Sequence, residues 1–369
     1  MPPVFSRPAS LWAAVFLLLA GCGGDSDSDA SRAPQALPEA KPVFASVVSF
    51  GDSLSDVGTY APLANGATQG KITTDPGPIW VENVAARLGL GITPYIVGIS
   101  PVSSSWEVCG RPACTGYAQG GARITDPAGG ANENGLQLAA LTQPVRTQIA
   151  NHLDVRGGAF RPDELVFVFA GNNDVFFQAK EFGRLAADPA VGPEAARQAA
   201  GAAIAAAANE LLAYVRDDIV AKGARYVVVM NLPYSSLSPS GQARDANGRA
   251  VLDFLVDTFN ATLAQGIAAN QLAVNLYDAN AAAAAIYRNP AAFGVVNIQE
   301  PACDREKIEA ATLGLVTDGT ALFCSRDRLT AAAARDPRFL FADRVHPSTL
   351  GHRLISDGVI QYLAGLGWL

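Results

Sequence analysis

Short runs of β-branched and other apolar residues, separated by longer helical patterns, constrain the fold of this chain more than any other feature. Four such runs are predicted strands: Val43 to Phe50, Leu165 to Ala170, Tyr226 to Met230 and Leu272 to Leu276. The main helical patterns cover Gln137 to Leu153, Glu194 to Val220, Phe254 to Ala268 and Ser348 to Leu363. Continuous apolar runs are typical of parallel strands that helices cover on both faces. The sequence therefore predicts an α/β protein, in which ligands bind at the carboxyl ends of the strands.

The N-terminus has the pattern of an export signal. Arg7 precedes an apolar stretch, Leu11 to Leu19, about half the roughly 20 residues that a membrane-spanning helix needs. Residues 19–22, LAGC, resemble the bacterial lipobox, in which the cysteine is acylated and becomes the new N-terminus. The alternative is an ordinary signal peptide that ends near a cysteine. We expect a signal peptide over residues 1–21 and a lipid on Cys22.

The segment after Cys22 predicts a flexible connection to a membrane. Residues 22–43 are rich in Gly, Ser, Asp, Ala and Pro and carry few large apolar side chains, as disordered tethers do. Two acyl chains are enough for stable anchoring. Gly23 rather than aspartate follows the cysteine, which in lipoprotein sorting favours the outer membrane. We therefore expect an outer-membrane lipoprotein that faces the periplasm or the cell surface.

Charge and length limit the other partners. The chain has 369 residues, 27 basic against 34 acidic, with a net charge of -7 and no cluster of Lys and Arg. Nucleic acid requires a positive surface, so we expect no nucleic-acid partner. At 49% apolar residues the chain has ample material for a core. We expect one large domain over residues 44–369, although the length also allows two.

The cysteines predict two disulfides. Of five cysteines, Cys22 is assigned to the lipid. The other four lie in two segments that we expect to be irregular, 98–134 and 290–342. An even number in an exported chain favours disulfides, and short loops close with the least loss of entropy. The predicted bonds are Cys109–Cys114 and Cys303–Cys324. Zinc binding is the alternative, but the repeated Cys-x-x-Cys spacing is absent, so we expect no metal. We expect the Cys303–Cys324 loop to affect which substrates fit the site more than it affects the catalytic step.

A serine follows the first predicted strand. Residues 51–58 read GDSLSDVG, and Ser53 stands where a glycine lets the backbone turn sharply and a nucleophile is exposed. A loop in which Ser and Asp cap a helix is the alternative. The segment resembles the first block of the GDSL family, also called SGNH hydrolases, in which this serine attacks an ester. Asp56 is expected to fix the loop through backbone amides.

Three further segments match the blocks of that family in order. They are residues 118–122 (AQGGA), 171–174 (GNND) and 343–347 (DRVHP). The resemblance implies that the oxyanion of the reaction is bound by the amide of Ser53, a glycine amide of the second block and the side chain of Asn173. The second block usually has Asn where this chain has Gly116, which leaves Gly120 and Gly121 open as the donor. We favour Gly121, and we expect Asn172 to face away.

Ester hydrolysis also needs a base and a group that orients it. The chain has three histidines. His152 lies in a helical pattern and is expected at the surface or a cap, and His352 is expected to pack within the last helix. His346 remains as the base, and Asp343 is expected to hold its imidazole. A helix cap or a salt bridge to Arg344 is the alternative role for Asp343.

Together these residues predict a serine ester hydrolase of the lipase or esterase type. The family implies a three-layer α/β/α sandwich with a flavodoxin-like parallel sheet of about five strands. We expect an acyl-serine intermediate, a Ser53–His346–Asp343 triad, no cofactor, and an ester or lipid substrate. A phospholipase, a carbohydrate acetylesterase or a catalytically inactive surface-binding lipoprotein remain alternatives. Aromatic side chains that could line a subsite are Trp80, Trp106, Phe176 and Phe177.

Overall fold

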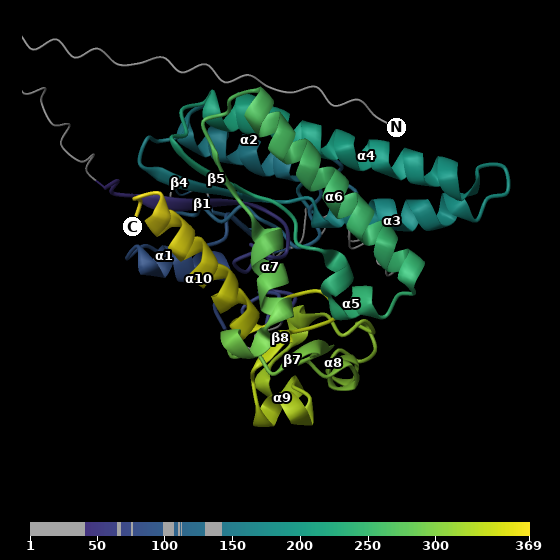
Figure 1. Ribbon diagram of the computed structural model, residues 1–369. Coiled ribbons are helices and arrows are strands. Elements are labelled where there is room, and N and C mark those ends of the chain that lie inside the picture. The colour runs from purple at the N-terminus through teal and green to yellow at the C-terminus, as the bar shows by residue number, and fades with distance from the viewer. Residues whose placement is uncertain are drawn as a thin grey trace, which may run out of the picture. The chain divides into compact units, whose positions relative to one another are not determined.

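A parallel sheet lies at the centre of the protein (Figure 1). The computed structural model describes residues 41–64, 68–74, 77–98, 107–109, 111, 113–129 and 142–369. The predicted signal peptide, Cys22, most of the predicted tether and Trp106 lie outside these residues. Within them, no helix is long and apolar enough to cross a membrane.

The central sheet has four strands in the described residues, in the order β1-β4-β5-β6, all parallel. They are β1 (Ser46–Gly51), β4 (Glu164–Phe169), β5 (Tyr226–Met230) and β6 (Asn275–Tyr277). Every residue of β4 is buried, as expected for a strand covered on both faces. Beyond β1, residues 115–119 run parallel to it, with a bridge between Ser49 and Gly116 and three backbone hydrogen bonds, but they form no regular strand, so the described residues contain four strands rather than about five.

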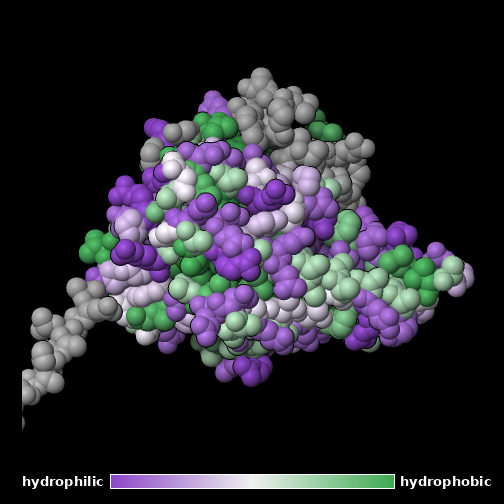
Figure 2. All heavy atoms as spheres, turned by 90° about the horizontal axis from the view of Figure 1, so that it is seen from above, coloured by the Kyte–Doolittle hydropathy of each residue, from purple (hydrophilic) through white to green (hydrophobic). Residues whose placement is uncertain are grey.

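Helices cover both faces of the sheet and confirm the three-layer sandwich. In Figure 1, α2, α3, α4 and α6 lie above the sheet, and α1 and α10 lie below it. The helices of eight or more residues are α1 (Trp80–Arg87), α2 (Val145–Arg156), α3 (Asn172–Ala186), α4 (Gly192–Tyr214), α6 (Ala246–Ala269), α7 (Ala279–Arg288) and α10 (Thr349–Gly365). Seen from the helical side, hydrophilic and mildly hydrophobic residues alternate on the surface, as on solvent-facing helices (Figure 2).

The ends of the helices depend on capping residues and local turns, which the periodicity of apolar residues does not reveal. The predicted helix from Glu194 to Val220 is α4 followed by a π-helical turn, η3 (Val215–Val220). Helix α6 begins at Ala246, earlier than predicted, because Asp245 accepts a hydrogen bond from the Gly248 N–H and caps the helix. Among the helices of eight or more residues in the described part of the chain, three were not predicted: α1, which packs on α10 and β1, α3, which packs on α4 and α6, and α7, which contacts α10.

The segment 290–342, expected to be irregular, contains regular structure, so that expectation is wrong. Its two strands, β7 and β8, form a separate two-stranded parallel sheet. The elements of this segment are η5 (Pro290–Phe293), β7 (Asn297–Pro301), α8 (Arg305–Ala311), η6 (Ala321–Phe323), η7 (Arg326–Arg328), α9 (Ala331–Arg335) and β8 (Phe339–Phe341). In the first irregular segment, β3 (Glu107–Val108) pairs with β2 (Ile96–Val97). Elements this short leave no clear periodicity in the sequence.

Both predicted disulfides are present. Cys109 is bonded to Cys114, and Cys303 is bonded to Cys324. The second bond closes a segment that contains α8 and η6. This segment lies at the same end of the molecule as β7 and β8 (Figure 1).

Candidate active site

The turn after β1 is held by glycine and by a buried side chain of α2. Gly51 has a φ of +151°, and a Cβ at this position would lie 2.0 Å from the carbonyl oxygen of Phe169, so only glycine fits. The buried side chain of Gln148 accepts from the Gly51 N–H and donates to the Gly51 carbonyl, both at 2.9 Å. This clamp fixes the backbone that carries Ser53. No motif in the sequence pointed to Gln148.

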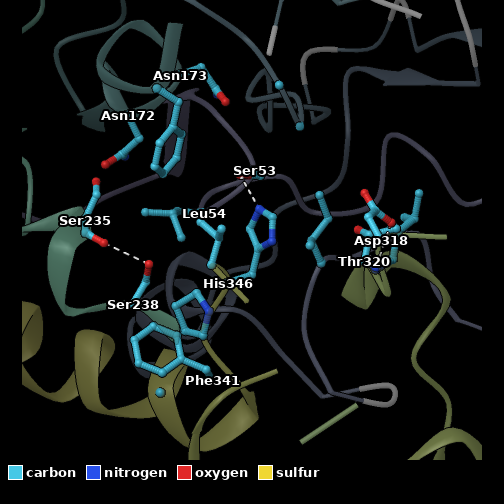
Figure 3. Close-up of a pocket in the computed structure, with 18 of the residues that line it drawn as sticks. Ser53, Leu54, Asn172, Asn173, Ser235, Ser238, Asp318, Thr320, Phe341 and His346 are labelled. Carbon is cyan, nitrogen blue, oxygen red and sulfur yellow. Dashed lines mark hydrogen bonds between the residues drawn. The ribbon is translucent and has the colours of Figure 1, made fainter. Parts of the chain in front are cut away.

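Ser53, His346 and Asp343 form a continuous chain of hydrogen bonds. The Ser53 Oγ lies 2.9 Å from the His346 Nε2 (Figure 3). On the other side of the ring, the His346 Nδ1 lies 2.8 Å from the Asp343 Oδ2. A carboxylate only accepts, so the Nδ1 carries the proton and the Nε2 is left to accept from the serine. Ser53 comes from the N-terminal part of the chain, and Asp343 and His346 come from the C-terminal part. Their order is that of a nucleophile, a base and a group that orients the base.

Asp343 is held by backbone amides as well as by the imidazole. Its carboxylate accepts from the N–H groups of Val345 and His346 and, at 2.7 Å, from the N–H of Ala321. Ala321 belongs to the segment closed by the Cys303–Cys324 disulfide. The expectation that this loop matters mainly for substrate shape is therefore incomplete, because the loop also contacts the group that orients the base.

The electrostatics of the pair favour a charged imidazole. Burial opposes protonation of His346, but the adjacent Asp343 carboxylate, with smaller contributions from Asp52 and Asp318, raises the pKa of the imidazole above its ordinary value of 6.5. Burial likewise opposes ionisation of Asp343, yet His346 and the amide donors hold the pKa of Asp343 below its ordinary value. The aspartate thus stabilises positive charge on the histidine, as a base needs while it carries a proton.

The second block is tied to the first through Asp56. The buried carboxylate of Asp56 accepts from the N–H groups of Gly58 and Thr59 and, across the site, from the Gly120 N–H at 2.8 Å. Burial raises the pKa of Asp56 to about 6. The bond to Asp56 engages the Gly120 amide, so Gly121, which lines the cavity with a φ of +82°, is the better candidate of the two for binding an oxyanion.

Asn172 and Asn173 both line the cavity, at the start of α3 (Figure 3). The Asn173 side chain donates one N–H to the Ala122 carbonyl at 2.9 Å, which orients its amide. The Asn172 side chain donates to the Oδ2 of Asp52 at 3.0 Å, so the expectation that Asn172 faces away is wrong. Consecutive residues in the first turn of a helix that points at the sheet edge can both face the same cavity. Asp52 is fully buried, and burial raises its pKa.

The triad opens into a large, mainly apolar cavity of about 1110 Å³. This volume exceeds the roughly 300–1,000 Å³ typical of sites for drug-sized ligands. Apolar lining residues come from many parts of the fold and include Leu54, Tyr60, Leu63, Phe176, Tyr234, Leu237, Ala282, Ile286, Leu322, Phe341, Val345, Leu354 and Ile355. The cavity can hold a long apolar group with its reacting end at Ser53.

Among the other aromatic and histidine candidates, Phe176 lies at the cavity, whereas Trp80, His152 and His352 are buried in the fold. Trp80 is in the core against Phe167, whereas Phe176 lines the cavity. His152 is buried beside Glu164, so its predicted surface or cap position is wrong. Burial lowers the pKa of His352 to about 3, and this histidine packs inside the fold as expected.

In the described residues, no three His, Cys, Asp or Glu side chains are grouped so that they could hold a metal ion.

Comparisons with known proteins give relatives over most of the chain. It is 22% identical to phosphatidylcholine-sterol acyltransferase of Aeromonas hydrophila, over 88% of this chain and 92% of that protein. It is 28% identical to esterase EstA of Pseudomonas aeruginosa and of Pseudomonas putida, over 90% of this chain but only 48% of each esterase, so the chain spans about half the length of those relatives.

Structural and family comparisons complete these findings. An extracellular lipase from Streptomyces rimosus aligns with 86% of this chain and 98% of its own, at a TM-score of 0.40 and 15% identity. The model of the GDSL-like Lipase/Acylhydrolase family matches residues 47–359, which include all four sequence blocks. The chain therefore belongs to the GDSL-like lipase/acylhydrolase family.

Proposed function

We propose that this protein hydrolyses carboxylic esters through an acyl-serine intermediate. The observation that carries the proposal is the hydrogen-bonded chain from Ser53 through His346 to Asp343, which opens into an apolar cavity. Esterase and acyltransferase relatives support the same reaction class. A catalytically inactive binding protein would have no need of a serine bonded to an oriented histidine.

The residues support the following reaction. His346 takes the proton of Ser53 as the Oγ attacks the ester carbonyl, and Asp343 stabilises the resulting imidazolium. Negative charge then develops on the carbonyl oxygen, where the amides of Ser53 and Gly121 and the side chain of Asn173 would bind it. The intermediate collapses, and the leaving alcohol receives its proton from His346. Water, activated by the same histidine, attacks the acyl-serine, and the acid and free Ser53 are released.

The cavity favours an ester with a medium or long acyl chain over an acetylated polysaccharide. Its lining is mainly apolar and its volume exceeds what an acetyl group fills. The acyltransferase relative is named for a phospholipid donor and a sterol acceptor, so a lipid acyl donor is a reasonable substrate to test. In our proposal water accepts the acyl group. Transfer of the acyl group to a sterol is the alternative that an experiment must exclude.

A panel of nitrophenyl esters from two to sixteen carbons tests the function. We expect a burst of nitrophenol and a kcat/KM that rises from the acetyl ester to longer chains. Acetylated xylan serves as the competing substrate. Absence of turnover on every ester, in folded protein, would reject an enzymatic role, and the highest rate on xylan would reject the lipid assignment.

The pH dependence should report the imidazole. Since His346 must be neutral to accept a proton and its pKa is raised, kcat/KM is expected to fall as the pH falls through a midpoint above 6.5. An Asp343→Asn variant should move this midpoint to lower pH in the residual activity, because it removes the charge that raises the pKa. The shift separates His346 from Asp56, whose pKa of about 6 does not depend on Asp343. An acid limb that stays in place would assign it to another group.

The disulfide that closes the segment with Ala321 should affect turnover. A Cys303→Ser/Cys324→Ser variant is expected to lose about 3 kcal/mol of stability through loop entropy and about tenfold in kcat, because Ala321 no longer holds Asp343 firmly. Denaturant unfolding and kcat at a temperature where the variant is folded are the measurements. Cys109→Ser/Cys114→Ser is the matched control, with a shorter loop and an expected loss of about 2 kcal/mol. Equal kcat in both variants would contradict the link to Asp343.

We also propose that a lipid on Cys22 anchors the protein to the outer membrane. The lipobox-like residues 19–22 support this location, and the disulfides fit an exported protein. In a Cys22→Ser protein we expect release from washed membranes with kcat unchanged, because the residue lies outside the hydrolase domain. Cell fractionation checks the result. Retention of the variant in the outer-membrane fraction after washing would show that another contact anchors the protein.

A further inference from the structure

Two leucines at the rim of the cavity are among the most exposed apolar side chains of the protein. Leu313 is 89% exposed and Leu315 is 75% exposed. Both belong to the turn of residues 312–316, which follows α8 and borders the cavity into which Ser53 opens. Exposed apolar side chains that gather beside a binding cavity mark an interaction site more often than scattered ones do.

The turn is rigidly built. The Gly314 N–H donates to the Glu309 carbonyl at 2.8 Å, and the Val316 N–H donates to the Thr312 hydroxyl at 3.2 Å. Thr312 in turn donates to the Ile308 carbonyl at 2.9 Å. The whole turn lies within the Cys303–Cys324 loop. The two leucines are thus presented by a fixed backbone rather than by a loose loop.

The backbone of Leu313 is unfavourable for leucine. Its φ is +53°, a left-handed conformation that costs an L-residue about 1 kcal/mol and that helix ends usually give to glycine. Helix α2 shows the ordinary solution, with Gly157 at a φ of +72°. Leu313 gains no burial in return for this strain. Because the exposed Leu313 does not stabilise the fold, its strained backbone suggests that the side chain has a function.

We propose that the turn 312–316 docks on a lipid surface and holds the opening of the cavity against it. The inference rests on the proposed ester hydrolysis and names where the apolar substrate enters. A lipid aggregate suits this site better than a protein partner for two reasons. Two leucines are far below the roughly 1,000 Å² that a specific protein interface buries. A protein bound here would also cover the entrance that the substrate must use.

Charge points to a zwitterionic rather than an anionic surface. No charged residue lies between Glu309 and Asp318, and both of these flanking residues are acidic. Docking should therefore depend on burial of the leucines and only weakly on salt. Vesicles of phosphatidylcholine are the appropriate probe.

A single fluorescent label tests the docking directly. In the full-length Cys22→Ser protein the four other cysteines are paired, so a Leu313→Cys change supplies one free thiol for a polarity-sensitive dye. Ether-linked phosphatidylcholine vesicles, which an esterase cannot cleave, should raise the emission several-fold and shift it to the blue. The matched control is Val43→Cys, which is 87% exposed and lies before β1, at the edge of the sheet opposite Ser53.

A second measurement uses vesicle flotation without a label. Leu313→Ser/Leu315→Ser in the Cys22→Ser background is expected to bind the ether-lipid vesicles at least tenfold more weakly than its parent. No response of the label at position 313, an equal response at position 43, or equal flotation of both proteins would each overturn the proposal. Because these readouts need no hydrolysis, docking without turnover on any ester would reject the proposed function and not the docking surface.

Discussion

Ser53→Ala is expected to lower kcat for a nitrophenyl ester by about 10,000-fold or more, with the fold unchanged. Among the described residues, Ser53 supplies the only hydroxyl that is hydrogen-bonded to the Nε2 of His346, so without it the acyl intermediate cannot form. Loss of the nucleophile of a triad has effects of this size, because the remaining residues act only as a unit. Steady-state kinetics and circular dichroism are the measurements.

The control for this change is Ser240→Ala. Ser240 lies on α5 (Pro239–Gln242), and its backbone N–H, which the substitution keeps, donates to the Arg344 carbonyl. We expect this variant to retain kcat within twofold. Phosphonate labelling followed by mass spectrometry should place the adduct on the peptide that contains Ser53. Retained turnover in folded Ser53→Ala protein, or an adduct elsewhere, would reject Ser53 as the nucleophile.

Asn173→Ala is expected to lower kcat by about 100- to 1,000-fold while KM changes little. Charge on the carbonyl oxygen grows in the transition state, so a donor aimed at that oxygen stabilises this state selectively. Its bond to the Ala122 carbonyl uses one N–H of the Asn173 amide at the cavity, and the second N–H is the one that our proposal assigns to the oxyanion. The ratio of the effects on kcat and KM is the measurement that distinguishes this role from substrate binding.

A structural role for Asn173 predicts a different result. If the side chain only stabilised the start of α3, its removal would cost about 1 kcal/mol of stability and little in rate. Asn270→Ala is a suitable control, since Asn270 donates to the Gly266 carbonyl at the exposed end of α6, away from the cavity. Equal kcat for Asn173→Ala and wild type, at matched folded fraction, would mean that the oxyanion is bound by backbone amides alone.

The sequence predicts the central sheet and the candidate triad for a physical reason. Buried parallel strands have continuous apolar runs, and the residues that follow such strands meet at one edge of the sheet. The predicted strand Tyr226 to Met230 matches β5 residue for residue. Ser53 follows β1 directly, and the local spacing of Asp343 and His346 lets one hold the other.

Contacts between distant polar side chains could not be predicted in the same way. Gln148 clamps Gly51 across 97 residues, and Asn172 reaches Asp52 across 120. Gln148 lies in a predicted helix, and Asp52 and Asn172 lie in sequence blocks, but neither kind of pattern says which distant residue is the hydrogen-bond partner. The prediction that Asn172 faces away failed for this reason. The bond between Gly120 and Asp56 depends likewise on the packing of two loops.

The hydrogen bond from Ala321 to Asp343 has a consequence for the maturation of the protein. Its donor sits in a loop that is complete only once Cys303 and Cys324 have been oxidised. A newly made chain with reduced thiols would lack a firmly held aspartate and would turn over esters slowly. On the proposed function, full turnover would be reached only after the disulfide has formed in an oxidising compartment. The same covalent bond that stabilises the fold would thereby spare the lipids of the compartment in which the chain is synthesised.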